Sequence, residues 1–284
     1  MKDKLKRIIS KFGSITSFPT LWKSQVNGKP SRLIICQMGK VGSRSIEDSL
    51  ISLKLGVNVD HVHYLNSIDA IEESIKQSWF YSQEQMYHLQ SCRKVRKDID
   101  MFFEKYHWHV ITLVRDSISR TLSSYFFNLD MIDQTFLDDY KHRKDKIEDL
   151  ITTFRKKIPK IPDQSHWFDH HISDVFNIDI FDLSKPKESP YFIYHNDNTS
   201  VMLLKLERLS ECAEQAFDDF LGLKKFKLLK SNTSADRKYH DIYKEFTDTI
   251  SFSQEELQDI YNYRLMSGFY STKELDRFIK RWSN

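Results

Sequence analysis

Five short runs of the chain are rich in apolar and β-branched residues. They cover residues 32–37, 59–65, 107–115, 191–194 and 201–207. The first run (RLIICQ) and the centre of the third (HWHVITLVR) show no alternation of polar and apolar positions. Such runs are typical of parallel strands that are buried on both faces. The pattern therefore predicts five strands.

The segments between and after these runs have helical character. They cover residues 45–54, 68–106, 117–129, 130–165 and most of the last eighty residues. Asp116 or Ser117 is the expected cap of the helix that begins near residue 117. Ser253 and Ser271 each stand three residues before a Glu, the spacing of a capping box.

Strands that alternate with helices predict an α/β fold with a parallel sheet covered on both faces, followed by a helical C-terminal part. We expect a basic N-terminal extension at residues 1–30 and a single domain at residues 31–284. Within it, residues 130–165 are predicted to form a helical insertion that lines part of the ligand cleft.

Composition and charge narrow the functional class. The chain has 284 residues, of which 40% are hydrophobic and 29% charged, as in an ordinary soluble protein. The net charge of +3 does not support nucleic-acid binding. Residues 1–30 hold seven basic residues and one acid, a net +6, so the rest carries −3. Residues 1–12 either pack on the domain, which we favour, or make a weak peripheral contact with an anionic membrane.

The three cysteines, Cys36, Cys92 and Cys212, form no motif, which favours a reducing compartment over disulfides or a zinc site. No run has the length of a transmembrane helix, and the basic N-terminus lacks the apolar core of a secretory signal. The expected location is therefore cytoplasmic. The sequence does not indicate an oligomeric state.

The loop after the first strand, MGKVGSRS, has the features of an anion site. The chain has only 7 Gly, and two of them, Gly39 and Gly42, lie in this loop. Backbone N–H groups in such a turn and the N-terminus of the following helix attract negative charge. Lys40 precedes Gly42, so the loop is not a Walker A motif. The alternative is an ordinary turn with a surface lysine.

A second candidate anion site begins 75 residues later, where Arg115 ends the third strand. Ser123 follows eight residues on, in the predicted helix. A parallel sheet brings the ends of the first and third strands to one edge. Arg115 and Ser123 are therefore candidates to hold a second phosphate near the first. The alternative is that Arg115 simply pairs with Asp116.

Together the two segments resemble the sulfotransferases that use 3′-phosphoadenosine 5′-phosphosulfate (PAPS). The family's first loop reads P-K-x-G followed by three Ser or Thr residues, and it binds the 5′-phosphosulfate. The matching positions here are Lys40, Gly42, Ser43, Arg44 and Ser45. Arg44 replaces a small hydroxyl residue, and Met38-Gly39 replaces the usual residue before the lysine. The resemblance implies a P-loop-like three-layer fold with a central parallel sheet of about five strands flanked by helices.

The family's second motif reads R-D-P-x-x-R-x-x-S-x-Y/F, and its Arg and Ser hold the 3′-phosphate. Arg115 and Ser123 match these two positions, and Ser117 replaces the Pro. More of the chain is similar to one branch, the bacterial putative capsular polysaccharide synthesis proteins. The shared features are GKVGS, HVHYL, SYFFNL, WFD followed by VFNIDIF, LLKLERL, and FYSTKELDRFIKRW.

The second strand offers a general base. His61 and His63 are two residues apart, so both face one side of the strand, at the same sheet edge as Lys40. Some glycan sulfotransferases of the family use a His at the end of this strand, and we prefer His61 slightly over His63. Alternatives are a structural role for each His, or a metal site in a hydrolase formed with Asp60 or by residues 169–171 (DHH). His107 and His109 begin the third strand, at the opposite edge, and are predicted to be structural.

Two further sites follow from the resemblance. Glu207, which ends the fifth strand, is expected to order nearby backbone. Arg237 and Lys238 resemble late basic loops that cover the nucleotide, although a solvated charge run is an equal alternative.

We therefore predict an enzyme that moves a sulfuryl group from PAPS to a hydroxyl of a carbohydrate or polysaccharide. A His acts as general base and Lys40 stabilises the leaving phosphate. This mechanism requires no metal, because Lys40 and backbone N–H groups stabilise the charge. One alternative is an ATP- or GTP-dependent phosphotransferase, which would need Mg²⁺ ligands. The other is a non-catalytic nucleotide-binding partner in capsular polysaccharide assembly.

Overall fold

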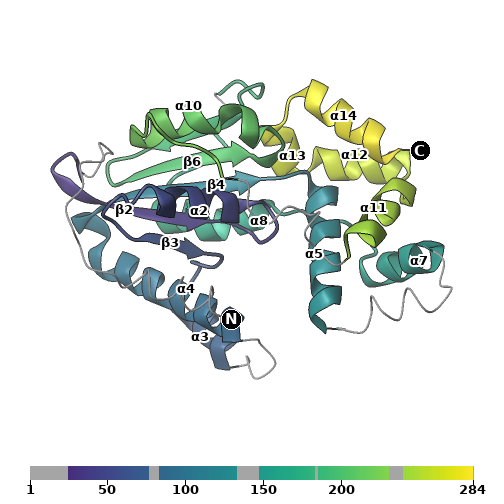
Figure 1. The fold of residues 1–284 in the computed structure, drawn as a ribbon, viewed down its shortest axis with the longest axis horizontal. Coiled ribbons are helices and arrows are strands. Elements are labelled where there is room, and N and C mark those ends of the chain that lie inside the picture. The colour runs from purple at the N-terminus through teal and green to yellow at the C-terminus, as the bar shows by residue number, and fades with distance from the viewer. Residues whose placement is uncertain (1–24, 77–82, 133–146, 183–184, 230–238, 284) are drawn as a thin grey trace.

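The protein is built around a twisted sheet with helices packed against it (Figure 1). The computed structural model describes residues 25–76, 83–132, 147–182, 185–229 and 239–283. The strands within these ranges are β1 (Gln25–Val26), β2 (Lys29–Cys36), β3 (Val59–Val62), β4 (His107–Val114), β5 (Tyr191–His195) and β6 (Thr199–Lys205). All five predicted strands are present, with ends shifted by a few residues. The short strand β1 was not predicted, because two residues carry no periodicity.

Four neighbouring strands, β3, β2, β4 and β6, are parallel. In this register Ile35 lies opposite both His61 and Ile111. The ends of these strands therefore meet at one edge, where the predicted site residues lie. A mixed α/β fold with parallel strands is confirmed.

The prediction of a wholly parallel sheet is wrong for β5, which pairs with β6 in antiparallel orientation. Only residues 196–198 connect the two strands. A parallel pair needs a crossover of a dozen or more residues, so this connection allows only a hairpin. Strand β1 is also antiparallel to β2, and Asn27 and Gly28 adopt positive φ between them.

The strands alternate their side chains between two separate hydrophobic clusters. In β2, Leu33 and Ile35 belong to the cluster that contains α2 (Ser43–Ser52) and α10 (Leu209–Leu221). Ile34 and Cys36 belong to the larger cluster on the other face. The alternation explains why β2 is apolar throughout, because both of its faces are buried.

The larger cluster joins the sheet to the remaining helices. In Figure 1 the C-terminal helices gather with α5 and α7 at the right of the sheet, while α3 and α4 lie below β3. The helices of this part are α3 (Ile68–Lys76), α4 (Gln83–Phe102), α5 (Ser117–Ile132), α7 (Ile147–Lys157), α8 (Ser165–Phe168), α9 (Asp174–Phe176), α11 (His240–Thr249), α12 (Gln254–Asn262), α13 (Arg264–Phe269) and α14 (Thr272–Trp282). Short turns of other helix types cover Phe103–Lys105, Asp169–Ser173 and Leu206–Arg208.

The predicted helix caps are present. Ser253 and Ser271 form capping boxes with Glu256 and Glu274 at the starts of α12 and α14. At the start of α5, the Ser119 N–H donates to Asp116 Oδ2 at 3.0 Å, so Asp116 and not Ser117 is the cap. The helical prediction for residues 130–165 is borne out at α7, while residues 133–146 lie outside the described ranges.

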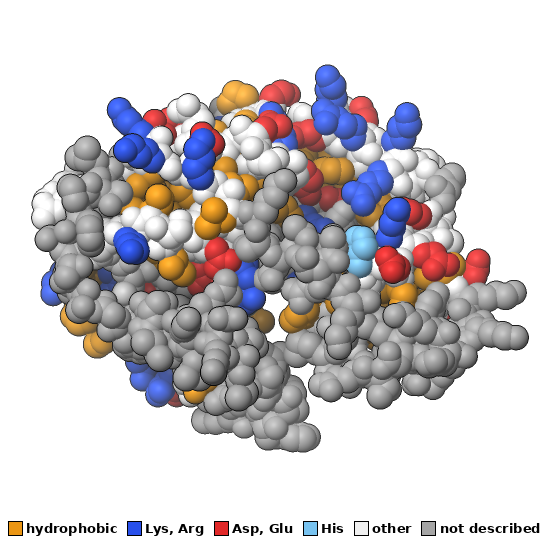
Figure 2. Space-filling view, in the orientation of Figure 1, with side chains coloured by type: hydrophobic (Ala, Val, Ile, Leu, Met, Phe, Trp, Pro, Cys, Tyr) orange, Lys and Arg blue, Asp and Glu red, His pale blue; other side chains and the backbone are white. Residues whose placement is uncertain are grey.

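Surface charge is mixed on the face drawn in Figure 2, where Lys and Arg are interspersed with Asp and Glu. None of the helices in the described ranges combines the length and apolar character that crossing a bilayer demands. Residues 1–12, Arg237 and Lys238 lie outside those ranges, so the predictions for them stay predictions.

Candidate functional site

The loop between β2 and α2 bends sharply through two residues with positive φ. Lys40 has φ +74° and Gly42, which precedes the first turn of α2, has φ +80°. A Cβ atom on Gly42 would lie 2.5 Å from Leu206 Cδ1, so the Leu206 side chain would have to move to accept it. The left-handed backbone at Gly42 therefore favours glycine, and the absence of a side chain leaves room for Leu206, in the turn after β6.

Two guanidinium groups hold this loop from the side of α5. Arg115 Nη1 donates to the Lys40 carbonyl at 2.8 Å, and Arg120 Nε donates to the Gly39 carbonyl at 3.3 Å. Both side chains are half-buried. Among the described residues, no carboxylate lies within 4.0 Å of either guanidinium. Burial, together with the charge of Arg115, lowers the pKa of Arg120. Arg115 and Arg120, together with the loop carbonyls that they bond, are here called the loop edge. The loop edge carries positive charge that the described carboxylates do not neutralise.

The alternative that Arg115 pairs with Asp116 is not observed. Asp116 is 1% exposed, and its two carboxylate oxygens are occupied elsewhere. Oδ1 accepts from the Tyr261 hydroxyl at 3.0 Å, and Oδ2 accepts from Trp282 Nε1 at 3.0 Å. Oδ2 also accepts from the N–H and hydroxyl of Ser119. Asp116 therefore ties the start of α5 to the C-terminal helices and leaves Arg115 to the loop.

Glu207 completes this junction. Its Oε1 accepts from the Asp116 N–H at 2.8 Å, and its Oε2 accepts from the Tyr270 hydroxyl at 2.8 Å. The expectation that Glu207 orders nearby backbone is confirmed. The backbone next to Arg115 is thus held by the turn that follows β6 and by the C-terminal part of the chain.

The remaining loop residues surround the same bend. The Lys40 ammonium lies 4.4 Å from the centroid of the Phe127 ring on α5, a cation–π contact. Ser43, Arg44 and Ser45 form the first turn of α2, where Ser43 is buried and Arg44 is exposed. Ser123 is half-buried on α5.

His61 connects strand β3 to this loop. Its Nδ1 lies 3.0 Å from Glu47 Oε2, and its Nε2 lies 3.1 Å from both Ser43 Oγ and Gln37 Nε2. A carboxylate only accepts hydrogen bonds, so Nδ1 carries the proton and, in the neutral ring, Nε2 accepts. The lone pair of His61 is therefore directed at the start of α2.

His63 lies just beyond the end of β3, and its Nδ1 is 2.7 Å from the Gln37 carbonyl. The carbonyl only accepts, so Nδ1 carries the proton and the lone pair is on Nε2. Burial, and next the neighbouring His61, lower the pKa of His63 to about 4. The ring is therefore neutral near pH 7. Its centroid lies 4.1 Å from that of His88.

Three further histidines, His107, His109 and His171, have structural contacts. His107 Nε2 lies 2.8 Å from Ser200 Oγ, and His109 Nε2 lies 3.3 Å from Ser31 Oγ, both at the edge opposite Lys40. His171 Nδ1 accepts from the Leu65 N–H at 2.9 Å, and burial lowers its pKa to about 4. Within the described ranges, no three His, Cys, Asp or Glu side chains come together as a metal site.

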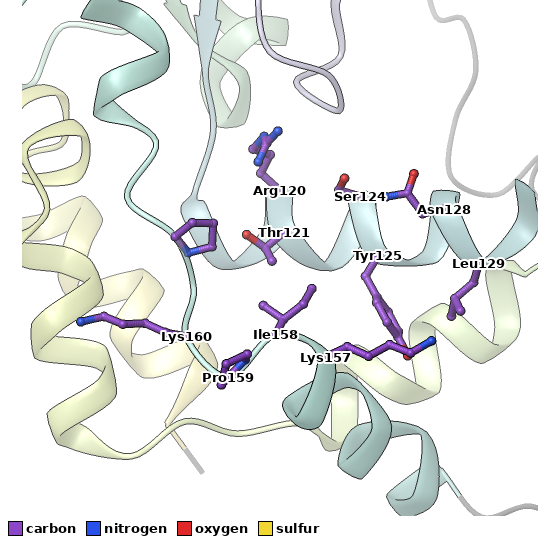
Figure 3. Close-up of a pocket in the computed structure, with 11 residues that line it drawn as sticks. Arg120, Thr121, Ser124, Tyr125, Asn128, Leu129, Lys157, Ile158, Pro159 and Lys160 are labelled. Carbon is purple, nitrogen blue, oxygen red and sulfur yellow. The ribbon is translucent and has the colours of Figure 1, made fainter. Parts of the chain in front are cut away.

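A pocket of about 440 Å³ lies along α5, next to the loop edge (Figure 3). Arg120, whose Nε bonds the Gly39 carbonyl, also lines this pocket. The loop edge and the pocket therefore share one side chain.

The sequence predicted most residues of this site but indicated no role for three of them, Arg120, Glu47 and Gln37. Arg120 had a signal, since it stands five residues after Arg115 in the second motif. Glu47 lies one helical turn after Ser43, a spacing that places both on one face of α2. No sequence signal pointed to Gln37, because a polar residue at a strand end is common.

Residues 138–271, a little under half of the chain, match the model of a protein family (NKWYS) described as putative capsular polysaccharide synthesis proteins. The matched segment contains Lys157, Glu207 and Tyr261 and begins after the loop, the histidine strand and Arg115. No curated protein matches the chain, and no solved structure matches it. A link to capsular polysaccharide synthesis is therefore supported for this segment.

Proposed function

We propose that the protein is a biosynthetic enzyme that transfers a sulfuryl group from PAPS to a hydroxyl of a carbohydrate, on a P-loop-like fold. The observation that carries the proposal is the convergence of Arg115 and Arg120 on the carbonyls of the glycine loop. Neither guanidinium has a carboxylate partner in the described part of the chain. Buried cations without an acidic partner are costly unless an anion compensates them.

The glycine loop provides a second group of anion-binding elements. Lys40, the loop N–H groups and the N-terminus of α2 make a site for the phosphosulfate end of the donor. Arg115 and Ser123 follow on the next strand and helix and are suited to the 3′-phosphate. Two anion-binding elements at one sheet edge fit a donor with phosphate groups at both ends of its ribose.

In this mechanism the acceptor hydroxyl forms a new bond to sulfur while the bond from sulfur to the bridging phosphate oxygen breaks. Lys40 stabilises the negative charge that develops on that phosphate oxygen. A histidine receives the proton of the acceptor hydroxyl. The products are the sulfated sugar, the nucleoside bisphosphate and a proton.

The two histidines differ in how their lone pairs are used. In the neutral ring, His61 Nε2 already accepts a hydrogen bond from the Ser43 hydroxyl. His61 is therefore suited to holding the phosphate-binding loop in position. His63 is neutral near pH 7, with its proton held on Nδ1 by the Gln37 carbonyl. We therefore assign the base to His63 and a positioning role to His61, with Glu47 holding the ring.

The assignment predicts that His63→Ala lowers turnover on the order of 10²–10⁴-fold, the usual contribution of a general base. Nucleotide affinity should hardly change. Wild-type turnover should fall only below about pH 5, because His63 takes up a proton near pH 4. A loss on His61→Ala alone, with His63→Ala fully active, would return the role of base to His61.

Calorimetry tests the nucleotide. The full chain is titrated with 3′,5′-adenosine bisphosphate and with ATP, each with Mg²⁺ and with EDTA. We expect tighter binding of the bisphosphate, unchanged by EDTA. Tight Mg²⁺-dependent binding of ATP, without binding of the bisphosphate, would instead favour a phosphotransferase. Bisphosphate binding without turnover on any screened sugar would favour a non-catalytic nucleotide-binding partner.

A further inference from the structure

The pocket along α5 has the size of a ligand site. Its volume of about 440 Å³ lies within the roughly 300–1,000 Å³ of small-molecule sites. One wall is α5, and the other is the segment that follows α7 (Figure 3). The lining residues are Arg120, Thr121, Ser124, Tyr125, Asn128, Leu129, Lys157, Ile158, Pro159, Lys160 and Pro162.

The two walls differ in polarity. Arg120, Ser124 and Asn128 are spaced by four residues, so they form one row on α5. In Figure 3 this row projects from one side of α5, while Thr121 and Tyr125 project from the other side, toward Ile158 and Pro159. The lining thus combines polar side chains with apolar ones. Such a mixture suits a sugar ring, which has hydroxyls at its edge and C–H groups on its faces.

The charged side chains of the lining are all cations. Lys160 is partly compensated by Asp259, whose Oδ2 lies 3.5 Å from its Nζ. Arg120 and Lys157 have no carboxylate within 4.0 Å among the residues that the structure describes. No Asp or Glu is part of the lining. The ligand that fits this pocket therefore carries negative charge.

A buried hydroxyl in the pocket also lacks a partner. Tyr125 is 6% exposed, and within the described ranges its hydroxyl makes no hydrogen bond. Burial raises the pKa of this phenol, so it remains a neutral donor. Buried hydroxyls in proteins are normally paired, so the Tyr125 hydroxyl is a hydrogen-bond donor that the described part of the chain leaves unused.

We propose that this pocket binds a saccharide that carries a carboxylate. Arg120 lines the pocket and bonds the Gly39 carbonyl, so the pocket lies beside the glycine loop. We infer from this position that the saccharide is the acceptor of the proposed reaction. That role rests on the proposed function. The carboxylate pairs with Lys157, and the sugar face packs on Ile158 and Pro159.

The test uses two disaccharides that differ only in one carboxylate, cellobiuronic acid and cellobiose. Each is titrated calorimetrically into the full chain at low salt, with and without saturating 3′,5′-adenosine bisphosphate. We expect the acid to bind about tenfold more tightly, since hydrogen bonds to charged groups are stronger than neutral ones. The preference should shrink as salt is added.

A matched pair of variants locates the site. Lys156 and Lys157 are exposed neighbours at the end of α7, but only Lys157 lines the pocket. Lys157→Gln should weaken the acid about two- to fivefold and leave cellobiose unchanged. Lys156→Gln should change neither affinity.

Equal affinities for the two sugars, no binding of either, or equal effects of the two lysine variants would overturn the pocket proposal. Failure of the bisphosphate to bind, with the acid preference and the Lys157 effect intact, would overturn the proposed function and leave the acidic-sugar site standing. The two failures are therefore distinguishable.

Discussion

Two cationic regions of this molecule, one buried and one half-buried, differ in whether a carboxylate pairs with their charge. At the end of β6, the Lys205 side chain is fully buried, and its Nζ donates to Glu274 Oε2 at 2.8 Å. The same ammonium donates to the Lys187 carbonyl and lies near the rings of Phe192 and Tyr270. At the loop edge, Arg115 and Arg120 meet backbone carbonyls and, in the described part of the chain, no carboxylate.

The difference separates structural from functional charge. A matched ion pair such as Lys205–Glu274 needs no ligand, and breaking it leaves an uncompensated buried charge. Unmatched guanidinium groups weaken the fold locally but provide binding energy to an anion. The comparison predicts that mutations at the end of β6 change stability and mutations at the loop edge change ligand binding.

The largest expected effect is at the matched pair. Glu274→Ala should lower the free energy of unfolding by about 3–5 kcal/mol, because it strands the Lys205 charge. Urea denaturation at pH 7 measures the change. Replacing both partners, as Lys205→Met with Glu274→Leu, should recover the part of the loss that is due to the stranded charge, while the lost capping box of α14 remains. If the double variant is as unstable as the single one, the stranded charge is not the cause.

The second effect is at the loop edge. Arg115→Met should weaken 3′,5′-adenosine bisphosphate by about 1.5–3 kcal/mol, the range for a hydrogen bond to a charged group. Adenosine 5′-monophosphate should be affected less, because it lacks the 3′-phosphate. Calorimetry supplies the affinities, and urea denaturation should show little loss of stability.

Arg93→Met is the control for Arg115, since Arg93 is an exposed residue of α4 that pairs with Glu72. It should change neither affinity. Equal losses for the bisphosphate and the monophosphate would mean that Arg115 acts through the fold of the loop.

The third expected effect is a loss of stability at acidic pH. An unfolded histidine has a pKa near 6.5, whereas burial holds the pKa of His63 and His171 at about 4 in the folded protein. Between these values the unfolded chain binds more protons. The free energy of unfolding therefore falls as the pH drops from about 6.5 to 4, on the order of 1–3 kcal/mol.

Urea denaturation at pH 7 and pH 5 measures this dependence. His63→Gln and His171→Gln should each reduce the difference between the two pH values, while His166→Gln, at an exposed site, should not. A wild-type stability that is flat over this range would contradict the prediction.

The smallest effect is at an exposed pair. Lys227 Nζ lies 2.7 Å from Glu214, but both side chains are largely exposed. Lys227→Met should change the free energy of unfolding by less than about 1 kcal/mol. A loss as large as that of Glu274→Ala would show that burial does not distinguish the pairs.

The sequence allowed the strands and the loop edge to be predicted for definite physical reasons. Buried parallel strands need continuous apolar runs, and the scarce glycine at position 42 has both positive φ and a close neighbour. Strand β5 was predicted, but its antiparallel direction was missed because apolar content does not encode strand direction. The available signal was the short gap between the two predicted runs, residues 195–200, since a parallel pair needs a crossover of a dozen or more residues.

The partners of Asp116 could not be predicted. Tyr261 and Trp282 lie 145 and 166 residues away along the chain, and no local pattern connects such distant positions. The pocket was likewise invisible, because its two walls meet only in the folded protein. The charged composition of residues 130–165 suggested an acceptor region without defining its shape.

The bonds of Asp116 also have a consequence for how the molecule is made. The carboxylate that fixes the start of α5 is translated well before Tyr261 and Trp282, the two ring systems that hold it. Contacts of such sequence separation form late in folding, because a long loop must close first. An unfinished or C-terminally trimmed chain can therefore assemble much of the sheet while its loop edge remains incomplete. Any ligand that needs Arg115 in place would then distinguish finished molecules from unfinished ones.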